Sequence, residues 1–115
     1  MADNTTYVLA LDLKNDPNLI AEYEAYHRKV WPEIKQSIYD KGIIDLQIYR
    51  AGNRMMMIMK TRPDFSFDQA AEMDAANPKV QEWETLMWKF QQPLPQAQPG
   101  EKWILMDKIF DLSQD

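Results

Sequence analysis

The 115-residue sequence contains no cysteine and only three glycines. Without cysteine the chain has no disulfides, thiolate nucleophiles or zinc–thiolate sites, and this composition fits the reducing cytoplasm, where we expect the protein to be. Gly42, Gly52 and Gly100 lie far apart, so there is no glycine-rich loop of the kind that binds phosphates. We therefore expect no nucleotide cofactor.

Long apolar runs and clusters of positive charge are also missing. No segment approaches the roughly 18 to 20 consecutive apolar residues of a membrane span, and the first residues lack the charged and apolar regions of a signal peptide. The formal charge is −5, whereas nucleic-acid binding depends on local positive charge. These features predict no membrane or nucleic-acid partner, and they favour a neutral small molecule as ligand.

What the sequence does contain is the composition of an ordinary globular domain. Hydrophobic residues make up 45% of it and charged residues 27%, which is too apolar for a disordered chain. A chain of 115 residues is long enough to bury one hydrophobic core without disulfides or metals. We expect a single domain over residues 1–115.

Four segments have the patterns of β-strands. Residues 7–13 and 43–49 alternate with a period of two, as expected of strands with one buried face. Residues 55–59 are apolar on both faces, which suggests that something covers the second face of their sheet. A turn-forming run joins the second and third strands in a hairpin. Residues 103–110 are predicted as a fourth strand, after a proline-rich surface loop over 91–102.

Helical patterns separate these strands. Asp16 and Pro17 mark a helix start, because aspartate caps free backbone N–H groups and proline suits the first helical position. Pro32 is expected to kink or restart this helix. Residues 67–76 and 79–90 are predicted as two further helices. In the first helix, side chains at spacings of three and four form one inward stripe: Ile20, Tyr23, His27, Val30, Ile34 and Ile38.

The order strand, helix, strand, strand, helix, strand is typical of the ferredoxin-like α+β fold, a split βαβ sandwich. In this fold the helices cover one face of the sheet and leave the other face open. We expect a second copy of the chain to cover it, so that two sheets pair face to face in a dimeric α/β barrel. The predicted oligomer is a homodimer.

His27 is the only histidine, and its unperturbed pKa of about 6.5 suits it to give and accept a proton near neutral pH. Tyr23 lies one helical turn before it and Trp31 one turn after it. Aromatic rings can pack on the C–H face of a sugar while polar groups bind its hydroxyls. The alternative is a buried histidine bonded to a neighbouring carbonyl, among aromatic residues of the core.

A second candidate pair lies in the predicted helix 79–90. Trp83 offers another flat ring, and Glu84 offers a carboxylate that can accept hydrogen bonds from sugar hydroxyls. The alternatives are core packing for the tryptophan and a solvated surface position for the glutamate. Residue types alone leave both interpretations open.

Residues 23–33 add a specific motif, in which Tyr23 is followed four residues later by His27 and then by Trp-Pro-Glu. This spacing resembles the signature of the L-rhamnose mutarotase family, and the resemblance covers residues 7–110. Further matches are Gly42, Ile48-Tyr49 and Gln81-Glu82-Trp83.

The resemblance implies a dimeric ferredoxin-like domain that uses neither cofactor nor metal. It implies that His27 is the proton donor, that Tyr23 contacts the sugar and that Trp83 lines the pocket. Glu84 replaces a second tryptophan of the family, and Leu46 replaces a tyrosine that contacts the sugar. Segments such as residues 77–84 are similar to an L-fucose mutarotase branch, so L-fucose is the favoured substrate and L-rhamnose the next.

The predicted activity is therefore the interconversion of the α and β anomers of a free 6-deoxy-hexose. His27 protonates the ring oxygen, Tyr23 orients a hydroxyl, and Trp31 and Trp83 frame the ring. The base that removes the proton of the anomeric hydroxyl is Glu84, Tyr23 or a bound water. Two alternatives remain, since folds host unrelated chemistries: a cofactor-free monooxygenase of the dimeric α/β barrel type, and a binding module without turnover.

Overall fold

The alternating residues near the N-terminus form the central strand of an antiparallel sheet in the computed structural model, which describes residues 3–113. The sheet consists of β1 (Thr5–Leu13), β2 (Ile43–Ala51), β3 (Arg54–Thr61) and two very short strands, β4 (Gln91–Gln92) and β5 (Ile104–Leu105). Its order is β2-β3-β1-β4, and β5 also pairs with β1. This order confirms the predicted ferredoxin-like arrangement.

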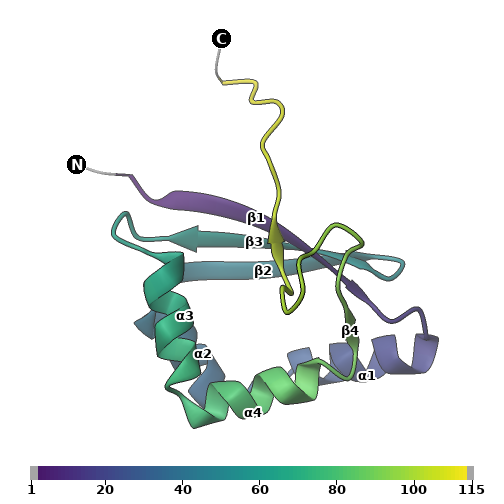
Figure 1. The fold of residues 1–115 in the computed structure, drawn as a ribbon. Helices are drawn as coiled ribbons and strands as arrows, with labels where there is room; N and C mark the ends of the chain where they lie inside the picture. The colour runs from purple at the N-terminus through teal and green to yellow at the C-terminus, as the bar shows by residue number, and fades with distance from the viewer. Residues whose placement is uncertain (1–2, 114–115) are drawn as a thin grey trace.

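The helices of the described chain lie on one face of this sheet (Figure 1). They are α1 (Pro17–His27), α2 (Pro32–Asp40), α3 (Phe67–Ala75) and α4 (Pro78–Met87). Proline opens three of them, at the position where its missing N–H is harmless. Asp16 caps α1 as expected, accepting from the N–H groups of Asn18 and Leu19. The predicted restart of the first helix at Pro32 is confirmed.

The predicted fourth strand over residues 103–110 is wrong in extent. Only Ile104 and Leu105 pair with β1, opposite Ala10 and Leu9. The neighbouring stretch of the same β1 edge is occupied by β4, which forms inside the segment predicted as a loop. After β5 the chain leaves the sheet and projects away from it (Figure 1). The predicted helix 79–90 also ends earlier, at Met87.

The hydrophobic core lies between the sheet and the helices. Leu11, Leu13 and Met55 contribute from β1 and β3 and are at most 1% exposed. Tyr23 and Trp83 reach the same cluster from α1 and α4. This core therefore fixes two predicted site residues against the sheet, because close-packed side chains have little freedom to move.

The opposite face of the sheet carries apolar side chains without a helix over them. Ile48 and Met57 point to the helices, where they line a cavity, so the alternating neighbours Tyr49 and Met56 point the other way. These two face each other across the β2–β3 pair and are 56% and 36% exposed.

In the part of the chain that the structure describes, no helix is long and apolar enough to cross a membrane. The cytoplasmic location stays a prediction. So does the single-domain extent over residues 1–115, whose first two and last two residues lie outside the described range.

Removing the α1 cap should destabilise the fold measurably. Asp16→Ala leaves the N–H groups of Asn18 and Leu19 without their acceptor, so we expect the free energy of unfolding to fall by about 0.5–2 kcal/mol. Asp16→Asn keeps a cap acceptor and should retain most of this stability. Urea denaturation of the three proteins measures the difference; equal losses in both variants would contradict the role of the cap.

Candidate active site

A cavity of about 370 Å³ lies between the sheet and the helices. Its floor is apolar and is formed by strand residues: Leu9, Leu46, Ile48, Met57 and Met59. Polar side chains from the helices and the C-terminal segments complete its lining: Tyr23, His27, Ser37, Lys41, Asp74, Glu84, Gln91 and Lys102. A mostly apolar cleft with a few converging polar groups is the usual form of a small-molecule site.

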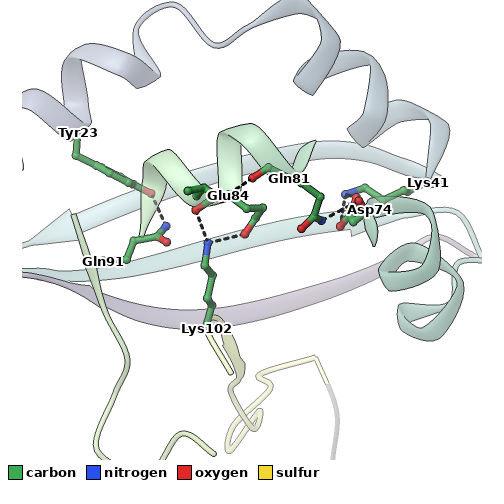
Figure 2. A network of polar contacts seen from close by, with 8 residues as sticks. Tyr23, Lys41, Asp74, Gln81, Glu84, Gln91 and Lys102 are labelled. Atoms are coloured by element: carbon green, nitrogen blue, oxygen red, sulfur yellow. Dashed lines mark hydrogen bonds and ion pairs between the residues drawn. The ribbon is translucent and has the colours of Figure 1, made fainter. Parts of the chain in front are cut away.

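Six of these polar side chains form three separate pairs, Tyr23–Gln91, Glu84–Lys102 and Lys41–Asp74. Figure 2 shows Tyr23 and Gln91 well apart from Lys41 and Asp74. Lys41 and Asp74 hold each other in an ion pair at 2.9 Å, so their charges are already compensated. His27 lies against Tyr23, so the pair that contains Tyr23 is the one beside a group whose unperturbed pKa suits proton transfer near neutral pH.

His27 is held in one tautomer by its own helix. Its Nδ1 lies 2.9 Å from the main-chain oxygen of Tyr23, one turn earlier in α1. A carbonyl oxygen only accepts hydrogen bonds, so Nδ1 must carry the proton and donate it. In the neutral ring Nε2 is then an unprotonated acceptor. The sequence left open whether His27 is a buried histidine bonded to a carbonyl. Its Nδ1 does have such a bond, and the residue also lines the cavity.

Burial also controls the charge of His27. It lowers the pKa of the imidazole below its ordinary value, because a desolvated site disfavours the charged form, and the bond to the Tyr23 carbonyl acts in the opposite direction. At neutral pH the ring is therefore mainly uncharged. A neutral imidazole with a free Nε2 is a proton acceptor first and becomes a donor after it has gained a proton.

Tyr23 lies directly against this imidazole, with the two ring centroids 4.3 Å apart. Its hydroxyl receives a hydrogen bond from Nε2 of Gln91 at 3.4 Å. Burial raises the pKa of Tyr23 to about 12; the Gln91 bond lowers it and the charge of Glu84 raises it further. The hydroxyl stays protonated at neutral pH, so Tyr23 acts here as a hydrogen-bond donor and not as an anionic base.

The two predicted tryptophans occupy different layers. Trp83 is 7% exposed, lines the cavity and has its ring centroid 5.6 Å from that of His27. Trp31 is not among the described lining residues; it packs edge-on against Trp83 at 5.0 Å. Trp83 is thus brought together with His27 and Tyr23, whereas Trp31 contacts Trp83 without lining the cavity.

Glu84 also lines the cavity, and its partly exposed carboxylate is paired with a lysine. Lys102 donates to its carboxylate and, at 3.3 Å, to its main-chain oxygen (Figure 2). The lysine side chain is only 13% exposed and lies 4.6 Å from the centroid of the Trp88 ring. The pair is therefore a fixed, charge-compensated part of the wall.

Sequence reasoning missed Lys102 and Gln91 as site residues. Gln91 meets Tyr23 across 68 positions and Lys102 meets Glu84 across 18, and both lie in a segment without periodicity. Within residues 3–113, no cluster of histidine, aspartate and glutamate side chains is suited to hold a metal ion.

The sequence is similar to those of known proteins. Residues 6–112 match the model of the L-rhamnose mutarotase family. An L-fucose mutarotase of Xanthomonas campestris pv. campestris is 46% identical over 106 residues, which cover 90% of this chain and 85% of that protein.

Solved structures of similar fold include a mutarotase and an oxygenase. The L-rhamnose mutarotase FA22100 of Formosa agariphila has a TM-score of 0.69 at 21% identity, over 94% of this chain and 98% of that one. SnoaB, a cofactor-independent oxygenase of Streptomyces nogalater, has a TM-score of 0.53 at 14% identity, over 98% of this chain and all of that one. At such identities the structures share an architecture, and the chemistry must be argued from the site.

The pKa of His27 should lie below 6.5 in the folded protein. NMR titration of its ring protons measures this directly, since the chain has no other histidine. The urea-unfolded chain, which should titrate near 6.5, is the reference. Because the unfolded state then binds the proton more readily, this residue should reduce the free energy of unfolding as pH falls below 6.5. A folded midpoint at or above the unfolded one would contradict the burial argument.

Proposed function

This chain belongs to the L-rhamnose mutarotase family, and we propose that it interconverts the α and β anomers of a free 6-deoxy-hexose. The observation that carries the proposal is the neutral His27, whose Nδ1 is bonded to its own helix while Nε2 is left as an acceptor. The hydroxyl of Tyr23 and the ring of Trp83 lie beside it in a cavity large enough for a monosaccharide.

Mutarotation moves one proton between two oxygens on the same carbon. Nε2 of His27 removes the proton of the anomeric hydroxyl and, as an imidazolium, gives it to the ring oxygen while the bond from that oxygen to the anomeric carbon breaks. The products are the open-chain aldehyde and neutral His27. The aldehyde group then rotates, and the same proton transfers in reverse close the ring on its other face, which forms the other anomer. Positioned proton transfer of this kind typically accelerates a reaction about 10²- to 10⁴-fold.

In these two proton transfers His27 is the donor to the ring oxygen and also the base that removes the proton of the anomeric hydroxyl. Tyr23, protonated at neutral pH, donates a hydrogen bond to the oxygen on which negative charge develops. Glu84, fixed by Lys102, accepts from hydroxyls elsewhere on the sugar. Trp83 provides the flat wall on which the apolar face of the ring packs. Trp31 holds that wall in place.

We propose L-fucose as the preferred substrate, with L-rhamnose next. The support is the 46% identity to a protein named L-fucose mutarotase. In addition, Leu46 and Glu84, where the sequence departs from the family pattern, both line the cavity. A changed set of hydroxyl contacts is what discrimination between two diastereomeric sugars requires.

Replacing His27 should abolish most of the catalysed exchange. For His27→Gln, which has no titratable nitrogen, we expect the rate on L-fucose to fall by about 10²- to 10⁴-fold. Saturation-difference NMR on L-fucose and L-rhamnose measures the exchange between anomers. Lys29→Gln, which changes an exposed residue outside the cavity, is the control and should retain the rate.

Anomeric exchange, measured together with sugar binding and oxygen consumption, separates the proposal from its rivals. Because the mechanism starts from neutral His27, the catalysed rate should rise with pH through the pKa of this residue and then level off. No acceleration of either sugar by the intact protein would reject the mutarotase function. Sugar binding without acceleration would indicate a binding module, and oxygen consumption with a quinol would indicate a monooxygenase.

We also propose that the chain forms a homodimer through the open face of its sheet. Tyr49 and Met56 present apolar surface there, and the projecting C-terminal segment adds Ile109 and Phe110, which are 96% and 76% exposed. Apolar patches of this kind are typical of protein interfaces.

Light scattering should therefore give twice the chain mass of 13.6 kDa. Met56→Arg puts a charge in the centre of the proposed interface and should shift the mass towards that of one chain. Tyr39→Arg, at a 61% exposed position on α2, should leave the dimer intact. A single-chain mass for the unmodified protein would rule out the interface.

A further inference from the structure

The two residues of β4 differ sharply in their surroundings. Gln91 is 5% exposed and lines the cavity, whereas its neighbour Gln92 is exposed and does not contribute to the lining. The strand pleat sends their side chains to opposite faces. Gln91 therefore places a polar amide in the cavity lining, next in sequence to the core residue Phe90.

One end of this amide is bonded and the other is not. Nε2 of Gln91 donates to the hydroxyl of Tyr23 (Figure 2). Its Oε1 is the buried side-chain atom that lacks any hydrogen-bond partner among the described residues. If the amide were rotated by half a turn, Tyr23 would donate to Oε1 and Nε2 would be left free. In both orientations one polar atom of Gln91 is buried without a partner.

A buried polar atom without a partner is unfavourable for the protein alone, and an apolar side chain of similar length would avoid it. Such a group is explained when a ligand completes its bonding. A hydroxyl is suited to it, because it can donate to Oε1 and can also accept from Nε2. The charge of Glu84 in the same lining is balanced by Lys102, so this end of the cavity favours a neutral ligand.

We propose that Gln91 is a sugar-contacting residue that determines which 6-deoxy-hexose is preferred. The inference rests on the proposed mutarotase function and adds a contact to it. L-Fucose and L-rhamnose have opposite configurations at carbon 2 and carbon 4 and otherwise share their ring hydroxyls. Gln91 binds the hydroxyl at one of these two carbons, in the orientation that L-fucose presents.

Its bond to Tyr23 gives Gln91 a second effect. Nε2 occupies a lone pair of the Tyr23 oxygen, so the O–H proton of Tyr23 is free to point elsewhere. Tyr23 lies against His27, where that proton can reach an oxygen of the reacting carbon. The same amide thus connects the contact that selects the sugar with the hydroxyl next to the transferred proton.

Sugars that lack one hydroxyl provide a direct test. For the intact protein and for Gln91→Met, the anomeric exchange of L-fucose, 2-deoxy-L-fucose, 4-deoxy-L-fucose and L-rhamnose is measured as kcat/KM. In the intact protein, removal of the hydroxyl that Gln91 binds should cost about tenfold. In Gln91→Met the same removal should cost almost nothing, and the preference for L-fucose over L-rhamnose should fall by about the same factor.

Gln92→Met is the matched control, because it makes the same change one residue further along the strand, outside the cavity. It should keep the intact protein's dependence on each hydroxyl. Thermal denaturation verifies that the variants fold, and Gln91→Leu gives the same comparison should the methionine variant be unstable.

The outcomes are distinct. A loss that depends on one hydroxyl and disappears in Gln91→Met supports the contact. An equal loss for every sugar, or no loss, would show that Gln91 is structural and would overturn the inference. If the intact protein accelerates no sugar, the proposed function fails. In that case, calorimetry of the binding of the same sugars to the same variants still decides whether Gln91 contacts a sugar hydroxyl.

Discussion

The site depends on one hydrogen bond, from Nδ1 of His27 to the main-chain oxygen of Tyr23. It exists because residues four apart lie above one another on a helix. The bond determines the tautomer, and the tautomer determines that Nε2 is the free acceptor. For this to hold, α1 must remain helical up to its last residue, His27. The cap at Asp16 and the restart at Pro32 delimit that helix.

Charge balance is the second constraint on the site. His27 is neutral because it is buried, Tyr23 keeps its proton for the same reason, and Glu84 is paired with Lys102. The cavity therefore holds hydrogen-bonding groups without an unbalanced charge, although the whole chain carries −5. Since burying an unpaired charge is costly, this arrangement suits an uncharged polar ligand better than an anion or a cation.

Periodic features of the sequence predicted most of the fold, and non-periodic ones did not. The alternation that ends at Leu13 predicted the central strand. The apolar stripe and Pro32 predicted the interrupted first helix and the position of His27 on its inward face. Trp31 was predicted on the same face, but α1 ends at His27 and Trp31 is the residue before α2, with extended φ and ψ of −57° and 136°. The helical spacing of three and four residues therefore does not predict where the side chain of Trp31 points. Gln91 and Lys102 depend on how the proline-rich segment folds back on β1, which no local pattern encodes.

That proline-rich segment leaves β1 at β4 and returns to it at β5. Both ends of the segment pair with neighbouring positions of β1. The loop between them can therefore change in length and sequence without disturbing the strand order. Gln91 in β4 and Lys102 shortly before β5 both line the cavity. An evolving lineage could thus alter the lining of the cavity through changes in this loop and at its ends, while the helix that carries His27 stays the same.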